Sequence, residues 1–158
     1  MITAVPATEE ANGGALLPAP ADATGPTGFS FTVPGIPTPW ARTGGGKTVA
    51  RFTPAKQGNA AGAIKLLCSA AMRGARPFEG PVRLTVTAAY PWPKSWSARK
   101  RAAQGWKTSR PDVDNLVKLI ADSLNGVAWL DDAQIAEEHI CKIYDFRPGL
   151  LVKVEMLT

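Results

Sequence analysis

The residues of this chain best suited to chemistry form an acidic cluster in its C-terminal third. Asp112 and Asp114 lie two residues apart, and Lys118 follows one helical turn later. A second acidic pair, Asp131 and Asp132, follows after a short connection. Carboxylates that hold Mg²⁺, next to a surface that attracts phosphate, are what the hydrolysis of a phosphodiester requires. The cluster therefore predicts metal-dependent chemistry on a phosphodiester.

The distribution of charge along the chain indicates a polyanionic partner. Residues 40–110 carry 14 Lys or Arg and one acid, Glu79, whereas 111–158 carry nine acids and four bases. The first 39 residues carry three acids and no base, and together the segments give the net charge of +5. Runs of basic residues often form only a solvated surface. One acid among 14 bases favours instead a surface that binds nucleic acid.

Length and composition are typical of one globular domain in a reducing compartment. The chain has 158 residues, of which 45% are apolar, so it can bury a full core. Cys68 and Cys141 are too few for a disulfide framework, and the single histidine, His139, disfavours zinc clusters. No segment approaches the roughly 20 apolar residues of a membrane span, and the N-terminus lacks a signal-peptide pattern. We therefore expect a cytoplasmic protein without a membrane partner.

The N-terminal region predicts a tail followed by the ordered domain. Residues 1–27 are rich in Ala, Pro and Gly, so we expect disorder, because they cannot bury enough apolar surface to offset ordering entropy. The domain should span 28–158 and begin with a strand at 29–33, where apolar and polar residues alternate. A glycine-rich loop with Arg42 and Lys47 follows. Its backbone could approach a phosphate closely, and an ordinary mobile hairpin explains it equally well.

The middle of the chain predicts a helix, a strand and a basic segment. Apolar residues recur at helical spacing over 56–73, and alternation over 81–90 is typical of a strand with one buried face. A short helix capped by Ser97 should follow. Cations are interleaved with tryptophans here, which suits nucleic acid, although each tryptophan alone is better explained as a loop anchor. The predicted DNA-binding residues are Arg42, Lys47, Lys94, Arg99, Lys100, Arg101 and Arg110.

The acidic cluster is expected at the start of a helix. Asp114 is predicted to cap a helix over 115–124. Asp112, in extended chain before it, should point to the same side, because side chains two residues apart share a side of an extended backbone. A final pair of strands is predicted at 138–144 and 149–156, joined by a tight turn.

Each acid also has a purely structural explanation. Asp114 could serve only as a cap, and Asp131 with Asp132 could form an ordinary turn. Asp122 is best explained as a surface ion pair with Lys118, one turn away. The combination is harder to explain this way, because two or three carboxylates suffice for Mg²⁺ and a nearby lysine can neutralise charge developing on phosphate oxygens.

The order and spacing of these motifs resemble the RusA family of crossover-junction endodeoxyribonucleases. The resemblance is carried by three segments, 111–118, 122–126 and 131–135, and by Lys142. It extends from about residue 29 to 155, and the tail is not part of it. The compound motif is specific, whereas an isolated Asp-x-Asp pair is not.

The resemblance implies a fold, an activity and a set of site residues. The implied protein is a homodimer of small α+β domains, each with a mixed sheet and two main helices. It binds four-way DNA junctions and resolves them by paired, Mg²⁺-dependent incisions in recombination and repair. The implied catalytic residues are Asp112, Asp114, Asp132 and Lys118, with the three aspartates as metal ligands and Asp131 as the adjacent carboxylate. Family members occur in bacteria and their phages, which implies a bacterial protein of host or phage origin.

Two other classes of function remain open from the residues alone. In the first, the chain is a non-catalytic DNA-binding module whose acids only hold the fold. In the second, it is a metal-dependent phosphoesterase that acts on nucleotides or single strands. A basic segment of some 70 residues is more than a small substrate requires, which disfavours the second class.

Overall fold

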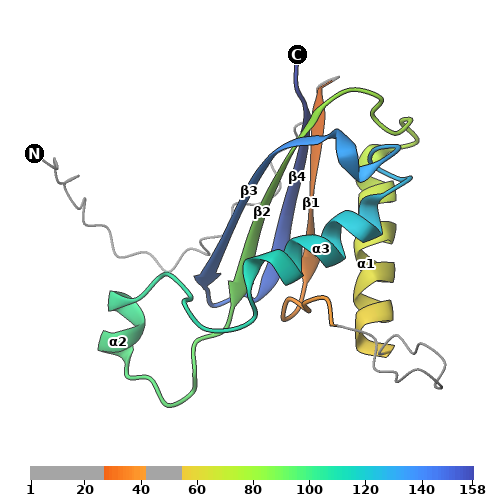
Figure 1. The fold of residues 1–158 in the computed structure, drawn as a ribbon. Helices are drawn as coiled ribbons and strands as arrows, with labels where there is room; N and C mark the ends of the chain where they lie inside the picture. Colours follow the sequence, from red (N-terminus) through yellow and green to blue (C-terminus); the bar gives the residue numbers. More distant parts are fainter. Residues whose placement is uncertain (1–26, 42–54) are drawn as a thin grey trace, which may run out of the picture.

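Among the residues that the structure describes, a four-stranded mixed sheet forms the frame, and it carries three α-helices and a 3₁₀ turn (Figure 1). The computed structural model describes residues 27–41 and 55–158. The elements are β1 (Gly28–Pro34), α1 (Ala55–Met72), β2 (Val82–Tyr90), α2 (Ala98–Ala103), α3 (Val113–Leu124), η1 (Asp132–Gln134), β3 (Ile135–Tyr144) and β4 (Gly149–Met156). The expected α+β class with two main helices is confirmed. The loop with Arg42 and Lys47 lies outside the described residues, as do residues 1–26 of the expected tail.

The strand order is β1-β4-β2-β3, with β2 parallel to β3 and the other pairs antiparallel. A parallel pair needs a long crossover, and here the crossover contains α3. The predicted final strands exist, but they are not neighbours, because β2 lies between them. Their connection instead passes the end of β2, where the Asp145 backbone N–H donates to the Tyr90 carbonyl over 2.9 Å.

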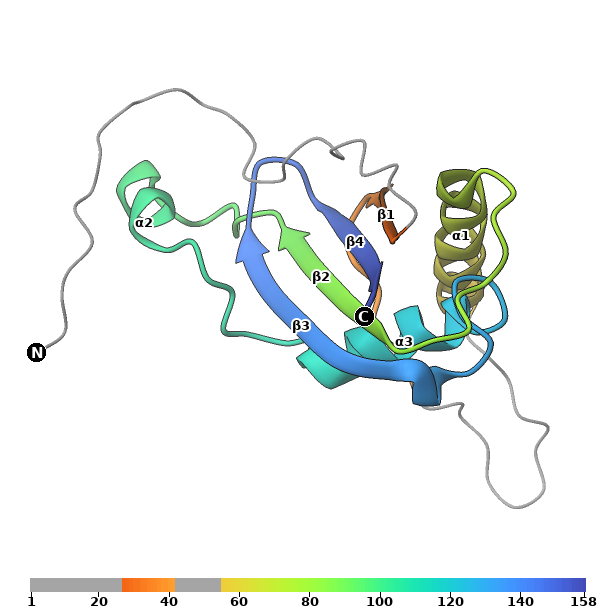
Figure 2. The ribbon, with the colours of Figure 1, turned by 90° about the horizontal axis from the view of Figure 1, so that it is seen from above.

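Helices α1 and α3 pack on the same face of the sheet and enclose the core (Figures 1 and 2). The alternation predicted for β2 is confirmed, since Val82, Leu84 and Val86 are all buried on this side. Trp129, which follows α3, is fully buried and is the largest such side chain in the described residues. The apolar faces of the two helices therefore fix how α3 lies across the sheet.

The opposite face of the sheet is polar. Arg83 on β2 donates from Nε to Glu137 Oε2 over 2.5 Å, and Lys153 on β4 pairs with Glu155 at 2.8 Å. The hydrogen bond from Arg83 lowers the pKa of Glu137. The first pair crosses from β2 to β3, whereas the second lies along β4, and both suit the solvated side of a mixed sheet. No helix among the described residues is long and apolar enough to span a bilayer.

Residues 91–111, here called the basic arm, leave the sheet after β2 and hold α2 away from it (Figures 1 and 2). The predicted cap of α2 is confirmed, because Ser97 Oγ accepts from the Lys100 backbone N–H over 3.3 Å. The arm then returns to the edge of β3, where the Tyr144 N–H donates to the Gly105 carbonyl over 2.7 Å. This return leads the chain directly into α3.

Candidate active site

Asp112 and Asp114 lie at the start of α3. The helix begins at Val113, so Asp112, with φ −76° and ψ 150°, is the N-cap, and the prediction that Asp114 caps the helix is wrong. Because Val113 is helical, the extended-chain argument for a shared direction of the two carboxylates does not apply. Asp112 makes no capping hydrogen bond with its side chain, and both aspartates are exposed. Two carboxylates are thus presented at the positive end of a helix dipole.

A cavity of about 490 Å³ opens beside Asp112. An indole, a guanidinium, a carboxylate and an amide line this cavity. Its volume is large enough for a phosphate and part of a nucleoside. Its lining residues are Pro39, Trp40, Arg110, Pro111, Asp112 and Asn115. The segment after β1 therefore contributes one wall of the site, although it lies far from α3 in the sequence.

Lys118 is held by an aromatic ring and not by an acid. Its Nζ lies 4.0 Å from the centroid of the Trp40 ring, a cation–π contact. The Trp40 backbone N–H donates to the Asn115 carbonyl over 2.8 Å, which ties this wall to α3. The described residues contain no ion pair between Lys118 and Asp122, so the structural explanation for Lys118 is not supported. The contact places the ammonium against Trp40, which lines the cavity beside Asp112.

Lys142 on β3 holds the segment that immediately precedes Asp112 in the chain. The ammonium of Lys142 donates to the Ser109 carbonyl over 2.8 Å and to the Pro111 carbonyl over 2.6 Å. The Lys107 backbone N–H donates to the Lys142 carbonyl over 3.0 Å. Both the side chain and the backbone of Lys142 therefore hold the end of the basic arm.

Asp131 and Asp132 form a small hydrogen-bonded turn after α3. Asp131 caps η1, since its carboxylate accepts from the Ala133 N–H over 2.8 Å, and Gln134 completes a capping box. Asp132 Oδ1 accepts from the indole N–H of Trp129 over 2.8 Å. The turn explanation is thus sufficient for Asp131, while a buried ring orients the carboxylate of Asp132 and leaves its second oxygen for another partner.

Within one chain, Asp132 does not join Asp112 and Asp114. The 12 residues of α3 separate them, a length of about 18 Å at 1.5 Å per residue. The Gly126 N–H donates to the Trp129 carbonyl over 2.8 Å, which keeps Asp132 at the C-terminal end of α3. The described residues accordingly contain no group of three metal-binding side chains. One protomer brings together Asp112, Asp114 and Lys118, and it places Asp132 elsewhere.

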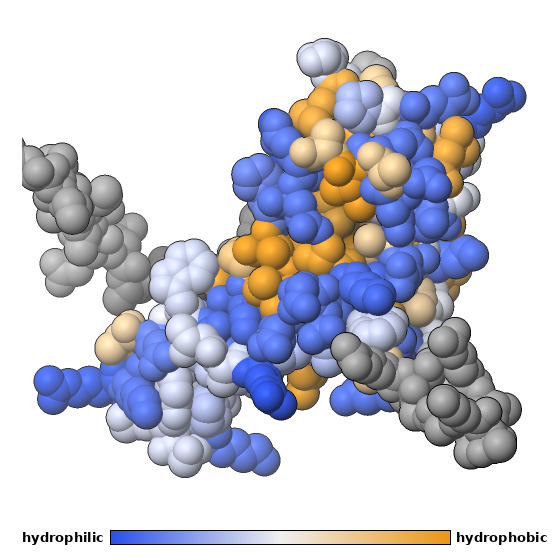
Figure 3. Space-filling view, in the orientation of Figure 1, coloured by the Kyte–Doolittle hydropathy of each residue, from blue (hydrophilic) through white to orange (hydrophobic). Residues whose placement is uncertain are grey.

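The predicted DNA-binding cations of the basic arm are displayed on its surface. Lys94, Arg99 and Arg110 are exposed, and the Lys100 ammonium lies 4.4 Å from the Trp96 ring centroid. Arg101 Nη2 donates to the Lys94 carbonyl over 3.4 Å. Figure 3 shows hydrophilic residues over the arm, beside a hydrophobic area between α3 and β3. These five cations therefore share one projecting element.

Two tryptophans of the basic arm anchor it to the core, and the third is exposed as a surface on which a base could stack. Trp96 lies 5.1 Å from the Tyr144 ring and Trp92 lies 6.5 Å from it, so both anchor the arm on the core. Trp106 is 66% exposed. An exposed indole among cations is the type of surface on which a nucleobase stacks.

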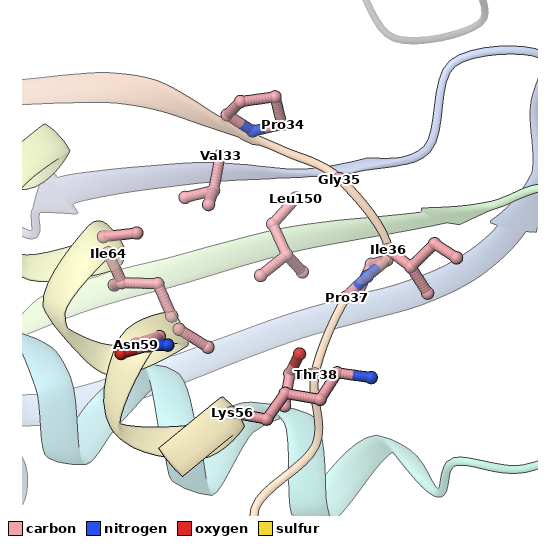
Figure 4. A pocket seen from close by; sticks show the side chains of 12 residues that line it. Val33, Pro34, Gly35, Ile36, Pro37, Thr38, Lys56, Asn59, Ile64 and Leu150 are labelled. Atoms are coloured by element: carbon pink, nitrogen blue, oxygen red, sulfur yellow. The ribbon is translucent and has the colours of Figure 1, made fainter.

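Other reactive groups of the described residues do not form a competing site. Burial raises the pKa of the Cys68 thiol to about 12, so it stays protonated and is a poor nucleophile at neutral pH. A second cavity, of about 250 Å³, lies between α1 and the end of β1 (Figure 4). Ile36, Ile64 and Leu150 give it an apolar lining, with Lys56 at its edge. None of the predicted catalytic residues lines it.

Trp40 and Lys142 contribute to this site but were not among the predicted catalytic or DNA-binding residues. Trp40 lay in a proline-rich segment whose only signal was an aromatic residue near cations. Lys142 belonged to the compound motif, but nothing in the spacing indicated its partners. Both act through contacts between segments distant in sequence, which periodicity does not report.

Comparison with known proteins gives a match to a protein family over most of the chain. The family model described as endodeoxyribonuclease RusA matches residues 34–155, which includes all the residues placed here at the site. The chain is also 34% identical over 85 residues to the uncharacterized protein YqaN of Bacillus subtilis (strain 168). That similarity covers 50% of this chain and 60% of the length of YqaN.

Proposed function

Because this chain belongs to the RusA family of endodeoxyribonucleases, we propose that it is a Mg²⁺-dependent endodeoxyribonuclease that resolves four-way DNA junctions. It would do so by paired phosphodiester hydrolysis during recombination and repair. The observation that supports the proposal is the placement of Asp112 and Asp114 at the start of α3, with Asp112 lining a cavity whose Trp40 wall holds Lys118, directly after a projecting basic arm. This arrangement combines groups for hydrolysis with a surface for the DNA backbone.

The residues at the start of α3 fit a magnesium ion. Mg²⁺ prefers oxygen ligands and is usually held by one or two carboxylates together with waters and substrate phosphates. Asp112 and Asp114 supply two exposed carboxylates, and the side chain of Asp112 is not used as a cap. When bound there, the metal supplies the Lewis acid for phosphodiester hydrolysis.

The remaining groups at the cavity bind and orient the substrate. Arg110 presents a planar guanidinium suited to phosphate oxygens. Lys118 places a positive charge where the scissile phosphate gains negative charge. Trp40 holds this ammonium by its ring and gives the cavity an apolar wall.

We further propose that the enzyme is a homodimer in which Asp132 of the partner subunit completes each site. Asp112 and Asp132 lie at opposite ends of α3, so a two-fold axis crossing the middle of α3 would bring the start of one helix near the end of the other. Val113 and Leu130, near the two ends of α3, are 40% and 58% exposed apolar side chains. The hydrophobic area between α3 and β3 in Figure 3 is a surface of the kind a partner covers.

A synthetic four-way junction incubated with the protein and Mg²⁺ tests the function directly. Symmetric paired incisions of the junction, and little cleavage of the matched linear duplex, are expected. Tight junction binding without cleavage would favour the non-catalytic DNA-binding module. Equal hydrolysis of single strands or mononucleotides would favour the general phosphoesterase.

Junction binding should weaken steeply with salt, because the basic arm contacts phosphates. If about six phosphates are contacted, the slope of log K against log salt should be about −5. Arg99→Glu should make the slope shallower by about one, and Lys65→Glu, an exposed lysine of α1, is the matched control. A slope near zero, measured by fluorescence anisotropy, would show that the arm is not a DNA surface.

Lys118→Ala should lower the cleavage rate by about a hundred-fold or more while junction affinity changes little. One cation among 18 adds little to binding, but this one lies against Trp40 and one helical turn after Asp114, close to the proposed metal ligands. Asp122→Ala should have little effect, because it forms no ion pair with Lys118. Lys118→Arg should restore activity only in part, since the guanidinium is broader than an ammonium. Small and equal losses for Lys118→Ala and Asp122→Ala would remove Lys118 from the catalytic group.

A further inference from the structure

Lys142 is a cation of the acidic C-terminal half whose ammonium is turned toward the protein backbone. It lies on β3, next to Ala88 of β2 in the sheet register, and is partly buried. Its Nζ donates to the carbonyls of Ser109 and Pro111 at 2.8 and 2.6 Å. An ammonium has three donors, so two of them are used by these carbonyls.

These bonds act on the segment of chain that immediately precedes Asp112. The arm returns to β3 through two backbone bonds, from the Tyr144 N–H to the Gly105 carbonyl at 2.7 Å and from the Lys107 N–H to the Lys142 carbonyl at 3.0 Å. Beyond Lys107, residues 108–111 form no backbone hydrogen bond to another segment of the described chain, and the bonds from Lys142 take over that role.

We propose that Lys142 is a positioning residue that fixes the end of the basic arm and thereby sets the place of Asp112 and Arg110 at the cavity. The inference rests on the proposed function, because it concerns the precision of that site. Charge-assisted bonds to backbone carbonyls are among the stronger hydrogen bonds, and loss of about 1 Å of precision at a reacting centre is enough to slow a reaction strongly. Lys142 thus acts through Asp112 and Arg110 and does not itself touch the DNA.

The alternative is that Lys142 is one more phosphate-binding lysine, and the two roles differ in what they change. A phosphate contact contributes about one unit to the salt dependence of binding and nothing to the order of the free protein. A positioning bond contributes to the order of the free protein and nothing to the salt dependence.

The test uses Lys142→Met, which keeps the length of the side chain and removes its donors. Hydrogen exchange of the free protein, without DNA or metal, is followed over residues 104–112 and over β2 as an internal reference. We expect exchange at the Lys107 amide to accelerate ten-fold or more, with β2 unchanged. The junction cleavage kcat should fall at least ten-fold, whereas KM should change much less. The salt slope of junction binding should stay unchanged, because Arg110 keeps its charge.

Three comparisons make the outcome decisive. Lys153→Met, which removes a surface lysine paired with Glu155 at 2.8 Å, should change none of these measurements. Lys142→Arg, which keeps donors for both carbonyls, should restore most of the protection at Lys107. If Lys142→Met does not fold, as judged by exchange in β2, Lys142→Leu, which also lacks donors, is assessed with the same measurements.

A salt slope that falls by about one, with unchanged exchange at Lys107, would overturn the proposal and make Lys142 a DNA contact. Unchanged exchange with an unchanged slope would also overturn it. The exchange measurement needs no nuclease activity, so it decides the role of Lys142 even if the protein cleaves no junction.

Discussion

Asp112→Asn is expected to lower the rate of junction cleavage by about a thousand-fold or more, and Asp114→Asn to do the same. The exchange removes one negative charge from a metal ligand while preserving its shape. Junction binding should remain nearly unchanged, because affinity comes from the basic arm. Single-turnover cleavage and binding measured at one salt concentration give the two quantities separately.

Asp122→Asn is the matched control for these variants. Asp122 is exposed on the same helix, two turns after Asp114, and it takes part in no described ion pair. Its amide variant should cleave within about two-fold of the wild type, as surface substitutions away from special features usually change little. Near-normal cleavage by Asp112→Asn or Asp114→Asn would exclude that residue from the site.

A mixed dimer of Asp112→Asn and Asp132→Asn is expected to recover about half of the wild-type nicking activity, although each variant alone is inactive. If Asp132 of the partner subunit completes each site, the mixed dimer of a two-fold assembly has one site that carries both substitutions and one intact site. Nicking should return, whereas paired incision should not, since only one site works. The dimer is prepared by co-expression with two affinity tags and assayed on a junction labelled on each strand.

The mixed dimer of Asp112→Asn and Asp114→Asn is the control, because both residues lie at the same end of α3. It leaves no intact site under either arrangement and should stay inactive. A mixed dimer of Asp112→Asn and Asp132→Asn that is equally inactive would contradict a site shared between subunits. Failure to recover any dimer through both tags would contradict the homodimer itself.

The sequence by itself determined the elements and the chemical nature of the site. Alternation predicted the buried face of β2, because a strand has a side-chain period of two and one of its faces is buried. Helical spacing predicted α1 within one residue at each end, since local periodicity reports a helix facing a core. The Asp112–Lys118 motif indicated the family, which the match over residues 34–155 confirms.

Two sequence-based predictions were wrong, one on where α3 starts and one on which strands pair. Asp112 and Asp114 are both of a residue type that is common at the N-cap, and the helix starts earlier than predicted, with Asp112 at the N-cap position although its side chain makes no capping hydrogen bond. β3 and β4 are close in sequence, and this proximity led to the prediction that they are neighbours in the sheet. The parallel partner of β3 is β2, however, because α3 supplies a crossover long enough for a parallel connection, and this places β2 between them.

Only the tertiary structure decided which of the predicted residues meet. Trp40 reaches Lys118 because the segment after β1 packs on α3, and Lys142 reaches Pro111 because the arm returns along β3. Asp132 is kept from Asp112 by the rigid length of α3, although the sequence places all the acids in one short region. Spacing along a chain determines which side chains share an element, whereas packing between elements determines which side chains share a site.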